Sequence, residues 1–274
     1  MELKEFTLSS HGRAIYGAYL QPDQIKRVVV LIHGLGEHAH RYLDGVVPAL
    51  LELDCAVVMF DNFGHGRSEG KRGHCPSYQA LMELLTQVIN KAKSLFPEYP
   101  VLLYGHSMGG NLALNYALKF QGIQGLVVTS PYLRLAFKPP AWKMKLGKIL
   151  LKVYPSFTLP SGLDPRGISR IPEEVSRYQE DPLIHDLVSP MFSFPIMDAG
   201  EWAIDNASEL AVPLLLMHGT ADPIIDFEAT RIFSKNAPKC TFVPFEGGYH
   251  ELQHDLDKDK LLATIGNWIG QNFP

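Results

Sequence analysis

Residues 101–110 read Val-Leu-Leu-Tyr-Gly-His-Ser-Met-Gly-Gly, an apolar run that ends in a serine flanked by glycines. Helical periodicity follows directly. A strand that turns at once into a helix leaves no room for side chains two residues either side of the turn, which accounts for Gly105 and Gly109. We therefore predict a nucleophile elbow that exposes Ser107. The backbone N–H of Met108 is expected at the helix N-terminus, where it can stabilise an oxyanion.

Two later segments provide a candidate acid and a candidate base. A serine hydroxyl is a weak nucleophile unless an imidazole takes its proton and a carboxylate orients that imidazole. Asp222 follows the apolar strand pattern at 214–217, and His250 follows the alternating run at 241–245. We predict that Ser107, Asp222 and His250 form a catalytic triad.

Each of these two residues has a rival nearby. Asp226 falls where the next helix begins, so its carboxylate is interpreted as a helix N-cap. His254 lies one helical turn after His250 in a polar stretch and is interpreted as a solvated surface residue. We prefer Asp222 and His250 for these reasons.

The second oxyanion donor is expected after an early strand. Residues 28–32 form a β-branched run typical of a buried parallel strand, and His-Gly-Leu-Gly-Glu-His follows at 33–38. The N–H of Leu35 is expected to point at the same site as that of Met108.

The histidines of this region do not indicate a metal site. His33, His38 and His40 are close in sequence, but no cysteine or carboxylate completes a plausible ligand set. We predict no metal and no organic cofactor, and we interpret His33 and His106 as groups that brace loops.

Strand and helix patterns alternate along the chain. Two strand patterns come first, joined by a His-Gly turn, as in an antiparallel edge. The later strand patterns lie at 28–32, 56–60, 101–104, 126–129, 214–217 and 241–245, and helical periodicity is clearest at 78–94 and 112–120. This alternation predicts an α/β fold with a mostly parallel eight-stranded sheet covered by helices on both faces. Ligands of such sheets bind beyond the carboxyl ends of the strands, where the candidate residues fall.

One long segment interrupts the alternation. No buried strand pattern occurs between residues 129 and 212, and prolines are frequent there. We predict a core made of 1–130 and 196–274, with a helical cap inserted at 131–195, before the strand that leads to the acid.

The predicted cap helix at 141–153 carries apolar side chains near helical spacing, with four lysines between them. It is consistent with contact with an anionic lipid surface, and equally with a lid that packs on the core and keeps its lysines solvated. Both interpretations place an apolar roof over Ser107.

Composition limits the class of protein. The chain has 274 residues, 46% of them hydrophobic, and a net charge of −4, which argues against a nucleic-acid partner. Three cysteines without zinc or redox spacing favour reduced thiols and a cytoplasmic location. The N-terminus lacks the pattern of a signal peptide, and no apolar run approaches the roughly 20 residues of a membrane span. We expect no transmembrane segment and at most peripheral association with membranes.

Four motifs bear on the family of the chain: His33-Gly34-x-Gly36-Glu37-His38, Asp61-x-Phe63-Gly64-His65-Gly66-Arg67-Ser68, Gly105-His106-Ser107-Met108-Gly109-Gly110 and Gly219-x-x-Asp222. Together they resemble the monoacylglycerol lipase and lysophospholipase group of α/β-hydrolases, which is similar to the serine aminopeptidase S33 hydrolases. The order Ser107, Asp222, His250 also matches that of α/β-hydrolases and differs from the orders in the chymotrypsin and subtilisin folds. The resemblance implies the α/β-hydrolase fold.

Finer similarities concern the substrate. The family's Glu-His-x-x-Arg-Tyr pattern and its tyrosine before Asp-Pro-Leu are matched here, which implies that Glu37, Arg41 and Tyr178 hold the glycerol hydroxyls. The alternative for Glu37 and Arg41 is a structural ion pair that stiffens the loop. Gln253 departs from the pattern, because some members have a histidine three residues after the catalytic one.

The resemblance implies a serine hydrolase that cleaves carboxylic esters of lipids through an acyl-enzyme intermediate. The expected reaction is hydrolysis of monoacylglycerol to glycerol and fatty acid. Alternatives are a lysophospholipase or general carboxylesterase, a serine aminopeptidase, and a non-catalytic lipid-binding or receptor protein of the same fold. An aminopeptidase would need an acidic cluster in the cap, for which the candidates are Glu173, Glu174, Glu180 and Asp181.

Overall fold

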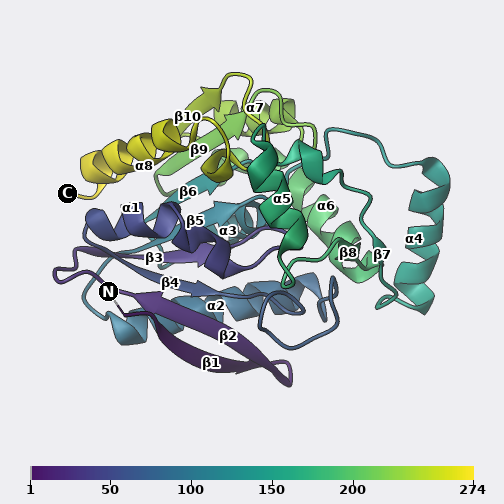
Figure 1. Cartoon of the computed structure of the whole chain (residues 1–274), viewed down its shortest axis with the longest axis horizontal. Coiled ribbons are helices and arrows are strands. Elements are labelled where there is room, and N and C mark those ends of the chain that lie inside the picture. Colours follow the sequence, from purple (N-terminus) through teal and green to yellow (C-terminus); the bar gives the residue numbers. More distant parts are fainter. Residues whose placement is uncertain (1) are drawn as a thin grey trace.

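The computed structural model describes residues 2–274 and contains an eight-stranded sheet in the order β1-β2-β4-β3-β5-β6-β9-β10 (Figure 1). The pairs β1–β2 and β2–β4 are antiparallel, and the other neighbours are parallel. The predicted mostly parallel sheet with an antiparallel edge is therefore confirmed. The strands are β1 Lys4–Ser10, β2 Arg13–Leu20, β3 Arg27–Ile32, β4 Cys55–Phe60, β5 Val101–His106, β6 Gly125–Thr129, β9 Leu214–Gly219 and β10 Cys240–Phe245.

Helices cover both faces of this sheet (Figure 1). Buried side chains of α1 and α8 form one core with the strands, and those of α2, α3 and α7 form a second core on the opposite face. Alternate residues of β3 enter the two cores: Val28 and Val30 join the second, and Val29 joins the first. The helices are α1 Val46–Glu52, α2 Tyr78–Leu95, α3 Met108–Lys119, α7 Phe227–Asn236 and α8 Lys258–Asn272.

The turn from β5 into α3 is as tight as the sequence predicts. Ser107 is the single residue between the two elements and has φ 52° and ψ −114°, a conformation that L-residues rarely adopt. A Cβ on Gly109 would lie 2.0 Å from the backbone oxygen of Ile32, and one on Gly105 would lie 2.5 Å from the oxygen of Gly109. The first turn of α3 thus packs directly on the end of β3.

The cap lies over the carboxyl edge of the sheet (Figure 1). The helix predicted at 141–153 is confirmed as α4. The cap elements are α4 Ala141–Val153, β7 Leu159–Pro160, η2 Pro165–Gly167, α5 Pro172–Glu180, β8 Leu187–Val188 and the first part of α6 Pro190–Asp205, and β7 and β8 pair as a two-stranded ribbon.

The predicted end of the cap at residue 195 falls inside α6, which continues through Pro195. The middle of this helix is tied to α3 in the core. The side-chain amides of Asn111 and Asn115 donate to the carbonyls of Ile196 and Ala199, each at 3.1 Å. One helix therefore serves both the cap and the core, which the proline frequency in the sequence did not indicate.

Gly109→Ala tests the packing of the elbow. Because the added methyl group would lie 2.0 Å from the backbone oxygen of Ile32, we expect the free energy of unfolding to fall by about 1–3 kcal/mol, as overpacking does. Urea denaturation measures this change. Gly270→Ala in α8 is the matched control, since nothing lies within 4 Å of its added methyl group, and it should be neutral or stabilising. Equal unfolding midpoints for Gly109→Ala and the unmodified chain would contradict the prediction.

Candidate active site

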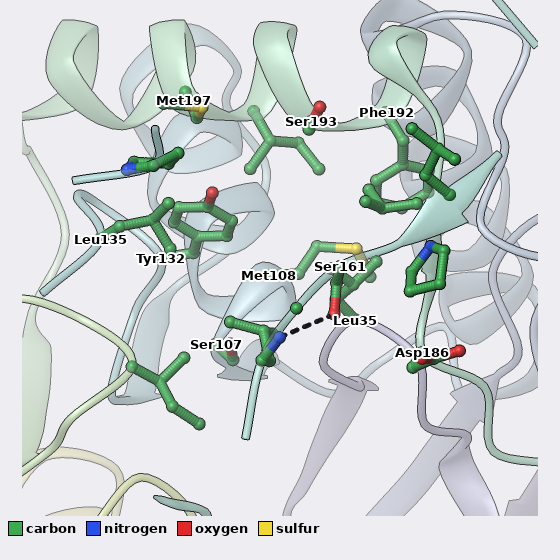
Figure 2. Close-up of a pocket in the computed structure, with 18 of the residues that line it drawn as sticks. Leu35, Ser107, Met108, Tyr132, Leu135, Ser161, Asp186, Phe192, Ser193 and Met197 are labelled. Carbon is green, nitrogen blue, oxygen red and sulfur yellow. Dashed lines mark hydrogen bonds between the residues drawn. The ribbon is translucent and has the colours of Figure 1, made fainter. Parts of the chain in front are cut away.

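A cavity of about 380 Å³ lies between the carboxyl ends of the strands and the cap (Figure 2). Ser107, Met108 and Leu35 lie at its base, and α6 passes across the opposite side (Figure 2). Most of its wall is apolar, and the cap contributes the largest share. The apolar lining residues from the cap and α6 include Phe137, Trp142, Leu146, Leu150, Phe157, Phe192, Phe194, Ile196 and Met197.

The structure brings the three predicted triad residues together at this base. The Nε2 atom of His250 lies 3.0 Å from Ser107 Oγ, and its Nδ1 atom lies 2.7 Å from Asp222 Oδ2. A carboxylate accepts hydrogen bonds, so Nδ1 carries the hydrogen and Nε2 is left to accept the serine proton. All three residues are buried, with Ser107 7% exposed.

The Asp222 carboxylate has more partners than the sequence analysis anticipated. Its Oδ1 atom accepts from the backbone N–H groups of Ile224 and Ile225 at 2.8 and 3.0 Å. His218 Nε2 lies 2.9 Å from Oδ2, beside the contact with His250. Burial alone would raise the pKa of Asp222, but His250 and His218 hold it well below its usual range. The sequence does contain an indication of His218, because this residue lies four positions before Asp222, at the end of a predicted strand.

The His250 imidazole is tuned by its surroundings. Burial alone would lower its pKa, but the Asp222 carboxylate raises the pKa above its ordinary value. The His106 ring lies 4.9 Å from the His250 ring, and burial together with His250 lowers the pKa of His106 to about 4. Ser130 Oγ donates to the backbone oxygen of His250 at 2.8 Å and fixes the loop. Sequence reasoning missed Ser130.

Two backbone N–H groups are available beside Ser107. Within residues 2–274, the N–H groups of Leu35 and Met108 have no hydrogen-bond partner. The preceding N–H, that of Gly34, donates to Glu37 Oε1 at 2.6 Å, which holds the loop in place. His33 braces the same loop as predicted, because its Nε2 accepts from the N–H of Asn62 at 2.9 Å.

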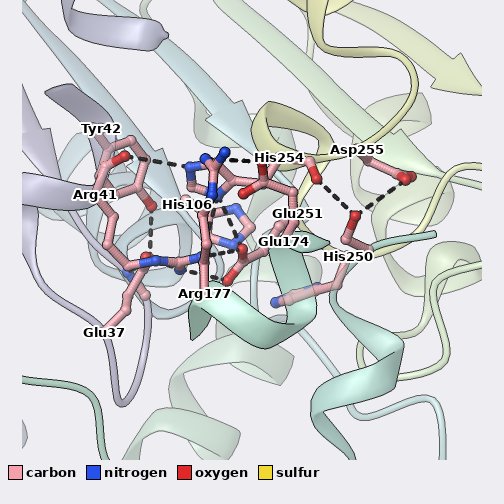
Figure 3. A network of polar contacts seen from close by, with 12 residues as sticks. Glu37, Arg41, Tyr42, His106, Glu174, Arg177, His250, Glu251, His254 and Asp255 are labelled. Atoms are coloured by element: carbon pink, nitrogen blue, oxygen red, sulfur yellow. Dashed lines mark hydrogen bonds and ion pairs between the residues drawn. The ribbon is translucent and has the colours of Figure 1, made fainter. Parts of the chain in front are cut away.

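Buried charges support the loop that carries Leu35 (Figure 3). The Arg41 guanidinium donates to Glu37 Oε2 at 2.7 Å and to both carboxylate oxygens of Glu251 at 2.7 Å. Arg41 holds the pKa values of both carboxyls below their usual range against the opposing effect of burial. The ion pair considered as the alternative for Glu37 and Arg41 is therefore present, and Glu251 is an additional partner that the sequence did not indicate.

The three residues expected to hold the glycerol hydroxyls do not occupy equivalent places. Glu37 and Tyr178 line the cavity, whereas Arg41 lies behind them with its guanidinium 4.9 Å from the centre of the Tyr178 ring. In the described part of the chain, the Tyr178 hydroxyl has no hydrogen-bond partner. Arg41 therefore pairs with two carboxylates and does not face the cavity.

The two rivals have structural roles. Asp226 caps α7 by accepting from the N–H of Glu228, as predicted. The interpretation of His254 as a solvated residue is wrong, because it is 8% exposed and its Nδ1 atom lies 3.0 Å from Glu251 Oε2. The polar residues around it are themselves buried in the Arg41 network, so polarity in the sequence did not mean exposure.

Across residues 2–274, no group of three or more histidine, cysteine, aspartate or glutamate side chains is arranged to hold a metal ion. The same stretch contains no helix with the length and apolar character needed to cross a bilayer.

Known proteins are similar to this chain in sequence and in fold. The family model described as serine aminopeptidase, S33 matches residues 23–257. A monoglyceride lipase from Rattus norvegicus is 31% identical over 97% of this chain and 90% of that protein. An uncharacterized abhydrolase domain-containing protein from Dictyostelium discoideum is 35% identical over 89% of this chain, which spans 26% of that longer protein. The crystal structure of Paleococcus ferrophilus monoacylglycerol lipase matches with a TM-score of 0.85 and 33% identity, covering 99% of this chain and all of that one (100%).

These similarities confirm the resemblance inferred from the motifs. The family model covers most of the chain, and the lipase relatives match it from end to end. The chain belongs to the serine aminopeptidase S33 family of α/β-hydrolases, and it is a hydrolase.

Proposed function

We propose that this protein is a serine hydrolase that cleaves monoacylglycerols to glycerol and fatty acid. The observation that carries the proposal is the Ser107–His250–Asp222 relay, with contacts of 3.0 and 2.7 Å, at the base of an apolar cavity. The similarity to proteins named monoglyceride lipase supports the choice of substrate.

The geometry suits acyl transfer. His250 Nε2 takes the Ser107 proton as Oγ attacks the ester carbonyl, and the N–H groups of Leu35 and Met108 stabilise the tetrahedral oxyanion. The alcohol then leaves with the proton from His250. Water, deprotonated by the same imidazole, attacks the acyl-enzyme and releases the fatty acid and free Ser107.

The two ends of the cavity differ chemically. The aromatic and aliphatic side chains of the cap suit an acyl chain. Near Ser107, the Glu37 carboxylate and the Tyr178 hydroxyl offer hydrogen bonds to the hydroxyls of glycerol. Arg41 supports this end indirectly, because it orients Glu37 and underlies the Tyr178 ring.

The lining argues against a lysophospholipid. Among the described residues, Lys143 is the one lysine or arginine that lines the cavity, and it is exposed on α4. Close to the reacting serine, a phosphate would meet the carboxylates of Glu37 and Glu251, with Arg41 already engaged by both. A neutral glycerol avoids this repulsion.

The positions of the acidic cap residues argue against an aminopeptidase. None of the four acidic residues considered for binding an ammonium group lines the cavity. Asp181 contacts His38 at 2.8 Å, and Glu174 contacts Arg177 at 3.1 Å. Glu173 and Glu180 are exposed. A general carboxylesterase would not need the polar end of the cavity, and a non-catalytic protein would not need the relay.

The cap also suggests contact with a lipid surface. The helix α4 has no buried residue, and Trp142, Ile149 and Val153 are 64%, 59% and 72% exposed. Lysines lie between these apolar side chains, which is typical of helices that bind anionic membrane surfaces. We include peripheral membrane contact in the proposal. The cytoplasmic location, which rests on three free cysteines, is part of it too.

Ser107→Ala tests the nucleophile. Removing the hydroxyl should lower kcat for a monoacylglycerol by roughly a millionfold, because the relay acts as a unit. A fluorophosphonate probe should label the unmodified protein and leave Ser107→Ala unlabelled. Ser193→Ala is the matched control, since Ser193 lines the same cavity without contacting His250, and it should retain labelling. Labelling of Ser107→Ala at the original rate would exclude the proposed mechanism.

Tyr178→Phe tests recognition of the alcohol. Without its hydroxyl, we expect kcat/KM for a monoacylglycerol to fall about two- to tenfold, and that for a p-nitrophenyl ester of the same chain length to change less. Tyr154→Phe is the control, because Tyr154 belongs to the cap but lies 52% exposed outside the cavity lining.

The unmodified enzyme should prefer the monoacylglycerol over the matching lysophospholipid and over amino-acid arylamides by more than about tenfold. Equal losses on both esters in Tyr178→Phe would remove the head-group role. A preference for lysophospholipid or arylamide would replace the proposed substrate.

Ile149→Gln with Val153→Gln tests the lipid surface. Neither residue lines the cavity, so hydrolysis of a dissolved p-nitrophenyl ester should be retained. Binding to vesicles of phosphatidylglycerol and phosphatidylcholine should weaken at least about tenfold, because two apolar side chains that would enter the membrane are lost. Leu256→Gln, which alters a side chain 68% exposed outside α4, is the control. Unchanged sedimentation with vesicles would refute the α4 contact.

A further inference from the structure

A second histidine contacts the acid of the relay from inside the core. His218 lies near the end of β9, is fully buried, and has a partner on each ring nitrogen. Its Nε2 atom lies 2.9 Å from Asp222 Oδ2, and its Nδ1 atom lies 2.8 Å from Thr230 Oγ1. Thr230 is itself buried, on α7.

The partners determine which ring nitrogen carries the hydrogen. The Asp222 carboxylate can only accept, so the His218 Nε2 that faces it is the donor. The Thr230 hydroxyl can then donate to the Nδ1 atom. A buried imidazole held at both ends in this way has one tautomer and one orientation.

We infer that His218 is a positioning residue for the reaction, holding Asp222 in the orientation that His250 requires, with Thr230 holding the His218 ring in place. This inference rests on the proposed serine hydrolase function. His218 does not touch the substrate or the reacting atoms, so its effect passes through Asp222. The donated hydrogen bond also spreads the negative charge of the carboxylate oxygen that it shares with His250.

The charged groups around His250 fix the direction of the expected change. Asp222, Glu251 and Glu37 raise the pKa of His250 against burial. Arg41 neutralises part of the effect of the two glutamates, and His106 is neutral at the pH of assay, since burial and His250 lower its pKa to about 4. Removing the His218 donor leaves more charge on the oxygen that faces His250, so the pKa of His250 should rise further.

The experiment compares His218→Leu, His218→Gln and Thr230→Val in the full chain. His250 acts as a base only when it is neutral, so kcat/KM rises with pH through the pKa of His250. We call this rise in the pH profile the limb, and in the unmodified enzyme it should lie above about pH 6.5. His218→Leu should lower kcat/KM about ten- to hundredfold at pH 7 and move the limb upward by at least about half a pH unit.

The other two variants test the mechanism of the effect. A glutamine amide can still donate to Asp222, so His218→Gln should keep the limb and recover most of the activity. Thr230→Val should shift the limb in the same direction by a smaller amount. His65→Leu is the matched control, because it removes a buried imidazole whose Nδ1 contacts the carbonyl of Phe63, 2.9 Å away, rather than a triad residue, and its limb should not move.

The results separate this inference from the proposed function. An unmodified chain that is neither labelled by fluorophosphonate nor active on esters would remove the proposed function itself. An active, folded His218→Leu with an unshifted limb would overturn the inference alone. Should His218→Leu fail to fold, as judged by circular dichroism, Thr230→Val and His218→Gln still decide, and the inference is wrong if Thr230→Val leaves the limb unmoved.

Discussion

The close contact between the first turn of α3 and the end of β3 is the constraint on which the site depends. A glycine at position 109 lets the backbone of the helix meet the backbone of Ile32 without an intervening side chain. Because β3 and β5 are parallel neighbours, this contact places the N–H of Met108 beside the loop of Leu35. Ser107 is left in a strained conformation that points its hydroxyl at His250. Sheet packing thus compensates for local strain at Ser107.

The polar end of the cavity depends on a second constraint, the pairing of buried charges. Glu37 and Glu251 share one guanidinium, and breaking such a buried pair typically costs about 3–5 kcal/mol. The same network orients the loop of Leu35 and supports the cap through the Tyr178 ring over Arg41. Stability of the loop and the recognition that we propose for a neutral alcohol therefore depend on one set of side chains.

Residues of α4 in the cap lie in two different environments, the cavity and the exposed surface. The inner side of α4 lines the cavity, while Ile149 and Val153 on the same helix are exposed. The helix is held by few contacts with the core, whereas α6 is anchored to α3 through the amides of Asn111 and Asn115. The cavity is therefore lined on one side by the exposed helix α4 and on another by the anchored helix α6.

The sequence by itself determined the strands, the sharp turn at Ser107 and the order of serine, acid and histidine, because each is written in local spacing and apolar periodicity. It also predicted α4 and the N-cap role of Asp226. Only the tertiary structure decided the partners of the buried polar groups: Glu251 on Arg41, His218 on Asp222, and the burial of His254. Partners such as Arg41 and Glu251 are 210 residues apart in the chain. Their pairing follows from how strand ends converge at one edge of the sheet, and no local pattern records that convergence.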